Sequence, residues 1–185
     1  MEHKDEFLTN AEKMSGELSE WRRTLHRSPE LSFREFKTAD FIAGVLETIE
    51  GLTIHRGVGL ETSVIATLGT GQAPVIALRA DIDALPINEA NACDYRSQTP
   101  GVMHACGHDA HAAILLGAAS LLAERFRSQR WDGTVKFIFQ PAEENEGGGR
   151  AMVEAGLFDK YPMEAVYGMH NIPGMPVGSF AVKPG

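Results

Sequence analysis

The sequence lacks any long apolar run, and its first twenty residues carry charges from the second position onward. A membrane span needs about 20 consecutive apolar residues, and a signal peptide needs an apolar core near its start. Neither pattern is present, and no repeat or low-complexity tract interrupts the chain. The sequence therefore predicts a cytoplasmic protein that does not associate with a membrane.

Positive charge is also scarce, because 17 Lys and Arg residues stand against 25 Asp and Glu residues, a formal net charge of −8. Nucleic acids and anionic membrane surfaces repel a chain of this sign. We therefore expect no nucleic-acid partner. A small molecule or a peptide fits the charge better.

Cysteine is nearly absent, with only Cys93 and Cys106 in 185 residues. A chain of this length and 43% hydrophobic content can bury a core without a disulfide. We expect both thiols to be reduced. Cys106 lies among histidines, which makes it a candidate metal ligand.

Hydrophobic periodicity predicts the α/β class, with a mostly parallel sheet flanked by helices. Two amphipathic helices are expected to open the domain, and strands and helices then alternate. The expected helices cover residues 14–27, 36–46, 109–126 and 148–157, and the expected strands cover 52–55, 62–68, 74–80, 134–140 and 164–170. The turn sequence GTGQAP separates the strands at 62–68 and 74–80, so we expect these two to pair as a hairpin.

Polar clusters follow three of the expected strands. RADID follows one strand, QPAEEN follows the next, and HNIPG follows the third. In open α/β sheets, ligands bind at the carboxyl ends of the strands. The three clusters are therefore expected to form one site.

The segment GVMHACGHDAH, residues 101–111, is the densest of the candidate ligand clusters. Thiolate and imidazole are preferred ligands of zinc and related metals, and Cys106 and His108 are spaced to reach one ion. His104 and His111 are expected to support the loop and the ligands instead. The alternative is that these histidines are solvated or cap the following helix.

Glu143 and Glu144, within QPAEEN, form the second candidate cluster. Adjacent carboxylates at a strand end are unfavourable unless a positive charge lies beside them, and a divalent metal supplies one. One carboxylate can then bind the ion while the other takes a proton from water. An exposed acidic turn is the alternative, although the pair follows an apolar strand and precedes a glycine run.

His170 and two aspartates complete the candidate site. A lone histidine at a strand end is often structural, but His170 is expected at the same sheet edge as the other clusters. Asp81 and Asp83 can orient histidine ligands by accepting a ring N–H, or can cap a turn or pair with Arg79. We favour the orienting role for Asp83.

Together these segments resemble the metallo-aminoacylase family, which includes hippurate hydrolase, bacterial N-acyl amino acid amidohydrolases and plant auxin-amide hydrolases. The resemblance covers nearly the whole chain in the family's order. It rests on WRRTLHRSPELSFREFKTADFI, ALRADIDALPI, GVMHACGHDAHAAILLGAASLL, GTVKFIFQPAEENEGGGRAMVEAGLF and VYGMHNIPGMPVGSFAVKPG.

The resemblance implies a zinc-peptidase-like catalytic domain that holds two divalent metal ions, which can be zinc, manganese, cobalt or nickel. It implies Cys106 as a bridging thiolate, His108 and His170 on one ion, and Glu144 on the other. Glu143 is then the general base that activates water and later protonates the leaving amine.

Members of that family run to about twice this length. The resemblance implies that residues 1–185 are the N-terminal part of the catalytic domain. An inserted α+β lid and dimerisation domain and a C-terminal catalytic segment with a last histidine ligand are then absent. We expect relatives with the lid to be homo-oligomers, and this chain to bind metal weakly, to have little activity and to expose an unpaired sheet edge.

The leading functional hypothesis is hydrolysis of the amide bond of N-acyl amino acids, of the hippurate or N-acetyl amino acid type. A dipeptidase or carboxypeptidase of the same architecture is an alternative. So is a non-catalytic fragment in which the four ligands close one structural metal site. A thiol hydrolase with Cys106 as nucleophile would leave Glu143 and Glu144 without a role.

Overall fold

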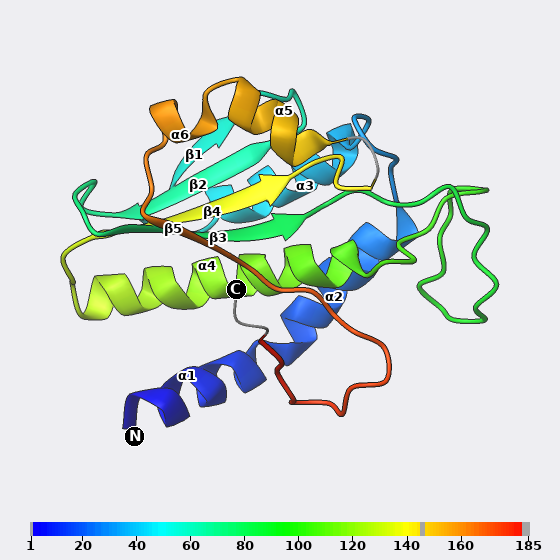
Figure 1. Ribbon diagram of the computed structural model, residues 1–185. Helices are drawn as coiled ribbons and strands as arrows, with labels where there is room; N and C mark the ends of the chain where they lie inside the picture. The colour runs from blue at the N-terminus through cyan, green and yellow to red at the C-terminus, as the bar shows by residue number, and fades with distance from the viewer. Residues whose placement is uncertain (1, 145–146, 183–185) are drawn as a thin grey trace.

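The computed structural model describes residues 2–144 and 147–182, and its centre is a five-stranded sheet with helices on both faces (Figure 1). The strands are β1 (Thr53–Arg56), β2 (Val64–Gly69), β3 (Val75–Asp81), β4 (Thr134–Gln140) and β5 (Ala165–Gly168). The helices are α1 (Glu2–Lys13), α2 (Ser15–Arg27), α3 (Phe36–Glu47), α4 (His108–Ser128), α5 (Gly148–Glu154) and α6 (Leu157–Lys160).

The sheet is mixed, with strand order β1-β2-β4-β3-β5. β3 runs parallel to both β4 and β5, whereas β2 runs antiparallel to both β1 and β4. The α/β class with flanking helices is confirmed, and its parallel part is the half that ends at the predicted polar clusters.

The predicted hairpin between residues 62–68 and 74–80 is wrong, because β4 lies between β2 and β3. β4 is buried at six of its seven positions, and the central place in the sheet covers both of its edges and both of its faces. The turn signal marks the end of β2 correctly. Burial of β4 at the centre of the sheet, and not the local turn, decides the pairing.

Two hydrophobic clusters lie on the two faces of the sheet. The larger joins α2, α3 and α4 to alternate residues of β2 and β4, including Val64, Phe137 and Phe139. The smaller joins Ile65 and Ile138 to α5 and α6 on the opposite face. This alternation is the period-2 pattern of strands that are covered on both sides.

Some helix boundaries differ from the sequence expectation. α1 precedes the first predicted helix, and its hydrophobic periodicity is weaker than that of α2. The helix expected at 148–157 is divided into α5 and α6 at Gly156, whose φ is 85°. Among the described residues, no helix is both long enough and apolar enough to cross a membrane.

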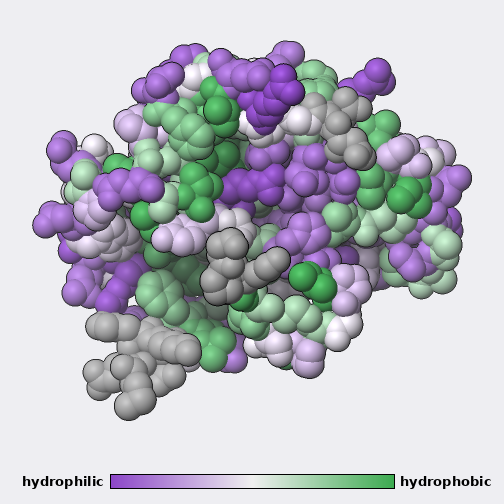
Figure 2. All heavy atoms as spheres, viewed as in Figure 1, coloured by the Kyte–Doolittle hydropathy of each residue, from purple (hydrophilic) through white to green (hydrophobic). Residues whose placement is uncertain are grey.

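β5 is an edge strand that pairs only with β3. Its Val166 and Tyr167 side chains are exposed, as expected for an uncovered sheet edge. Figure 2, in the same view as Figure 1, shows hydrophobic residues reaching this surface between hydrophilic ones.

Candidate metal centre

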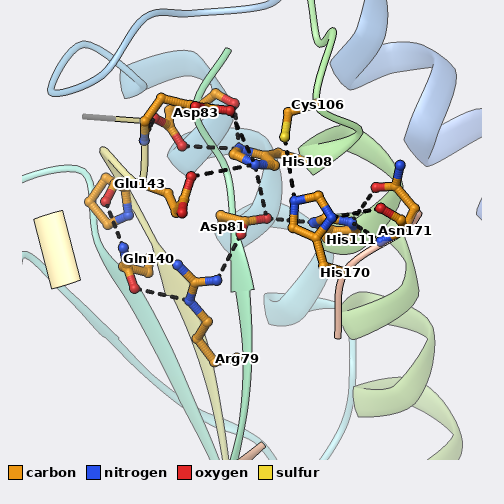
Figure 3. Close-up of polar contacts among 12 residues, drawn as sticks. Arg79, Asp81, Asp83, Cys106, His108, His111, Gln140, Glu143, His170 and Asn171 are labelled. Carbon is orange, nitrogen blue, oxygen red and sulfur yellow. Dashed lines mark hydrogen bonds and ion pairs between the residues drawn. The ribbon is translucent and has the colours of Figure 1, made fainter. Parts of the chain in front are cut away.

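The ends of β3 and β4, the start of α4 and the residues after β5 meet at one edge of the sheet (Figure 3). α4 can begin there because Gly107, with φ of 94°, turns the chain into the helix. A Cβ at Gly107 would lie 2.4 Å from Asn171 Oδ1, so only glycine fits this close approach. His108 is consequently the first residue of α4 and faces the ends of the strands.

His108 is common to three groups of side chains whose ligand atoms lie within 4.8 Å of one another. The groups are Cys106, His108 and His170; His108, Glu143 and Glu144; and Asp81, His108 and His111. The structure therefore brings together the residues predicted to bind metal and the predicted general base. Asn145 of the QPAEEN motif and residues 183–185 at the end of the VKPG segment lie outside the described residues.

The His108 ring is fully buried and is held at one nitrogen only. Its Nδ1 donates to the Asp83 carbonyl oxygen at 2.9 Å and to Asp83 Oδ1 at 3.1 Å. Among the described residues, its Nε2 has no hydrogen-bond partner, and it lies 3.7 Å from Glu144 Oε1 and 3.9 Å from Glu143 Oε2. Burial disfavours the protonated ring, but Asp83 and the surrounding carboxylates outweigh it and raise the pKa of His108.

The unpartnered atoms in this group fit a cation. With Nδ1 as the donor, His108 Nε2 offers a lone pair, and the carboxylate oxygens around it accept hydrogen bonds but cannot donate. Glu144 Oε1 is also buried, and no described residue is its hydrogen-bond partner. A buried cluster of acceptors is unfavourable unless a positive charge lies among them, and imidazole, thiolate and carboxylate suit zinc and its neighbours.

Cys106 adds a sulfur atom to the group, since its Sγ lies 3.4 Å from His170 Nε2. Burial and the Glu144 carboxylate raise the pKa of the Cys106 thiol to about 12. A cysteine nucleophile is activated by neighbouring positive groups that lower its pKa, and carboxylates do the opposite. The carboxylates around Cys106 therefore disfavour a nucleophilic thiolate, and a thiolate at this position requires a nearby cation such as a metal ion.

Asp83 joins two parts of the site. Besides holding His108, its Oδ2 accepts from the Glu144 backbone N–H at 3.0 Å and from Ser32 Oγ at 2.8 Å. Burial opposes ionisation of Asp83, but these hydrogen bonds, that of His108 first, lower its pKa to about 2. Contact with His108 is what an orienting role for Asp83 requires, and that role stays a prediction.

Asp81 and His111 form a supporting pair beside the group. A ring nitrogen of His111 lies 2.6 Å from Asp81 Oδ1, and its other ring nitrogen lies 2.6 Å from Asn171 Oδ1. Asp81 also accepts from Arg79, which is one of the three roles left open for it in the sequence, and its contact with His111 is the histidine contact of another. Asn171 was not singled out, although its place directly after His170 was a usable signal.

A further network fixes the start of α4 to α2. Asp109 Oδ2 accepts from Arg22 Nε at 2.9 Å and lies 2.8 Å from His26 Nδ1, while His26 Nε2 lies 3.0 Å from Glu89. The buried His104 ring lies beside this network, and burial lowers its pKa to about 4. The sequence alone gave no role to Arg22, His26 or Glu89. Each of them contacts a residue more than 60 positions away, so no local pattern marks the contact.

A family model, Peptidase family M20/M25/M40, matches residues 77–185, which include the expected metal ligands. The chain belongs to this family. The predicted membership of a metallohydrolase family is thereby confirmed.

Relatives extend the match toward the N-terminus. N-acetylcysteine deacetylase of Bacillus subtilis is 48% identical over 167 residues, which cover 89% of this chain and 42% of the relative. Thermostable carboxypeptidase 2 of Saccharolobus solfataricus is 40% identical over 176 residues, which cover 91% of this chain and 44% of the relative. The chain thus spans less than half the length of the curated relatives it matches.

Solved structures show the same fold. The Bacillus subtilis YXEP protein, described as a dinuclear metal binding peptidase from the M20 family, matches with a TM-score of 0.85 and 46% identity. That match covers 94% of this chain and 48% of the YXEP chain. An aminobenzoyl-glutamate utilization protein from Klebsiella pneumoniae matches with a TM-score of 0.70 and 27% identity, over 93% of this chain and 46% of that chain.

Proposed function

We propose that this polypeptide forms the N-terminal part of the catalytic domain of a metal-dependent amidohydrolase that cleaves N-acyl amino acids. The observation that carries the proposal is the pair of buried, unpartnered acceptors, His108 Nε2 and Glu144 Oε1, 3.7 Å apart beside Cys106 and His170. The name of the Bacillus subtilis relative, a deacetylase of an N-acetylated amino acid, supports the substrate class.

We assign the ligands as the donor chemistry and the family suggest. His108 and His170 would hold one divalent ion, Glu144 would hold a second, and Cys106 would supply a thiolate to the same centre. When bound, two such ions polarise the acyl carbonyl and lower the pKa of water. The description of the YXEP protein as dinuclear supports two ions, which can be zinc, manganese, cobalt or nickel.

Glu143 is the proposed general base. Its carboxylate lies at the rim of the group, 3.9 Å from His108 Nε2, and 39% of its side chain is exposed. Glu144 is more enclosed, with 19% exposed, and one of its oxygens is buried. The exposed carboxylate can take a proton from the attacking water and pass it to the leaving amine, while the enclosed one stays on the metal.

A carboxypeptidase or dipeptidase acting on free peptides is the second candidate. It is supported by the Saccharolobus solfataricus relative, which is named a carboxypeptidase. A closed structural metal site is the third candidate, and it predicts one ion per chain with no exchangeable water.

The test compares this chain with the full-length Bacillus subtilis deacetylase, both stripped of metal with a chelator. Each is titrated with Co²⁺, and each is then assayed on N-acetyl and N-benzoyl amino acids and on free dipeptides. We expect two Co²⁺ ions per molecule in both proteins, weaker binding by the 185-residue chain, and turnover of acylated substrates mainly by the deacetylase.

Three outcomes would change this assignment. No Co²⁺ bound by this chain at concentrations that saturate the deacetylase would overturn the metal centre. One tetrahedral ion per chain would favour the structural site. Robust turnover by the 185-residue chain would refute the prediction that it has little activity by itself. A cytoplasmic location and oligomerisation of relatives through a lid domain stay predictions that this experiment does not address.

A further inference from the structure

Glu35 is a buried carboxylate that the proposed chemistry does not use. It lies in the SFREF segment between α2 and α3, and none of its surface is exposed. Its Oε1 accepts from the backbone N–H of Phe33 at 3.0 Å and of Ala142 at 2.8 Å, and its Oε2 accepts from Thr62 Oγ1 at 2.8 Å. Three donors from three segments therefore meet one side chain.

Two of these donors have an unusual backbone conformation. Within the described ranges, Phe33 and Ala142 are the non-glycine residues with positive φ, at 60° and 53°. A side chain other than glycine is strained there, so the surroundings must hold the backbone in place. Both residues donate their N–H to the same oxygen, Glu35 Oε1, which is therefore placed to supply that restraint.

The position of Ala142 connects this restraint to the candidate metal centre. Ala142 is fully buried and directly precedes Glu143 and Glu144, and its carbonyl oxygen accepts from the Gly148 N–H at 2.8 Å. On the far side of Glu143, the Glu144 N–H is held by Asp83 at 3.0 Å. The amides on both sides of Glu143 are thus held by buried carboxylates from other elements.

We propose that Glu35 is a positioning residue, which fixes the turn at Ala142 and thereby sets the direction of the Glu143 and Glu144 side chains. This inference rests on the proposed function, since it gives those two glutamates their roles. The hydrogen bonds of the Glu35 side chain within the described residues go to Phe33, Thr62 and Ala142, none of which is a proposed ligand. A displacement of the turn moves both carboxylates together, because they share its backbone.

Two conservative variants separate position from charge. Glu35→Gln keeps an oxygen at the place where Phe33 and Ala142 donate, and its amide can donate to the Thr62 hydroxyl, but the negative charge is lost. Glu35→Asp keeps the charge but withdraws the carboxylate by the length of a methylene. If Glu35 acts by positioning the turn, Glu35→Gln should preserve Co²⁺ affinity better than Glu35→Asp. If Glu35 acts through its charge, Glu35→Asp should preserve it better.

Glu30→Asp is the matched control. Glu30 lies in the same connection between α2 and α3, and its Oε2 accepts from the Thr38 N–H and hydroxyl in the first turn of α3. Shortening it disturbs the same helix start without touching the Ala142 turn. Glu30→Asp therefore reports how much a general loss of stability in this segment affects the two measurements.

Two measurements on the 185-residue chain decide the proposal. The first is hydrogen exchange and chemical shift of the Ala142 amide by NMR, which reports the turn without any metal. The second is Co²⁺ affinity from the visible absorption spectrum. We expect Glu35→Asp to speed exchange at Ala142 and to weaken Co²⁺ binding about tenfold or more, the size typical of residues that orient ligands.

Glu35→Gln and Glu30→Asp are expected to match the wild type in both measurements. Unchanged Co²⁺ affinity and unchanged Ala142 exchange in Glu35→Asp would overturn the proposal, and so would a larger loss in Glu35→Gln than in Glu35→Asp. If the wild-type chain binds no Co²⁺, the proposed metal centre fails, and the Ala142 exchange rates still decide whether Glu35 holds the turn.

Discussion

The two histidines of the candidate metal centre are held in very different ways. His108 is fully buried at the start of α4, and its Nδ1 is fixed by two oxygens of Asp83, which follows β3. His170 is exposed two residues beyond β5, and within the described residues its Nδ1 has one hydrogen-bond contact, the carbonyl oxygen of the next residue, Asn171, at 2.7 Å.

This difference indicates that the site has a preorganised side and a side with little support of its own. His108 is anchored by elements that belong to the main hydrophobic cluster, so its ring has one orientation available. The residues after β5 form no helix or strand up to 182 and are almost all exposed. Metal affinity in this chain should therefore depend on the two sides unequally.

Removal of the His108 ring or the His170 ring should give the largest effects on Co²⁺ affinity and tests the difference between them directly. We expect His108→Ala to weaken Co²⁺ binding about 100-fold or more, beyond the typical loss for an orienting residue, and His170→Ala to weaken it about tenfold. The His170 side chain loses conformational freedom when it binds the ion, and this entropy cost reduces its net contribution to affinity. The His108 ring is fixed before binding and has no such cost. Isothermal titration calorimetry measures both, and equal losses would refute the division into two sides.

Asp83→Asn should remove the preorganisation while leaving every ligand in place. An amide in place of the carboxylate cannot accept from His108, Ser32 and the Glu144 N–H together, so we expect Co²⁺ affinity to fall about 10- to 100-fold. Asp40→Asn, at an exposed ion pair with Arg56, is the control and should bind as the wild type does. Wild-type affinity in Asp83→Asn would show that His108 needs no orienting partner.

The supporting segment around Glu35 should show a pH dependence of stability. Burial raises the pKa of Glu35, although its three hydrogen bonds act in the opposite direction. The folded chain thus holds the proton more tightly than the unfolded chain, so this group's contribution declines as pH rises from about 4.5 through the raised pKa. Glu35→Gln lacks this titration.

We therefore expect the free energy of unfolding of Glu35→Gln, measured in urea, to improve relative to the wild type between pH 4 and pH 7. A constant difference across that range would mean that the carboxylate does not titrate with a raised pKa.

The smallest effect is expected for a substitution in the edge strand β5, on the His170 side of the site. Val166→Lys places a charge on the exposed edge strand β5, and charged residues on edge strands prevent pairing between chains. We expect less self-association at high protein concentration by sedimentation velocity, with a change in unfolding free energy within about 0.5 kcal/mol. Co²⁺ affinity should stay at the wild-type value, because Val166 is not a proposed ligand, and an altered affinity would show that β5 also positions His170.

The errors of sequence reasoning have a common origin. The residues that bear metal-ligand chemistry were visible because their types and spacing are local features. The hairpin was predicted from a local turn, but β4, from 65 residues further along the chain, takes the place beside β2. Glu35 and His26 carried no signal, because the groups they hold, Ala142 and Asp109, come from distant segments.

By itself, the sequence determined the α/β class, the family and the set of candidate ligands, since hydrophobic period and side-chain chemistry are properties of short segments. Only the tertiary structure decided which donors lack partners, which carboxylates hold backbone amides and which histidine is buried. Those properties depend on distances between segments that meet only when the hydrophobic clusters on the two faces of the sheet are formed.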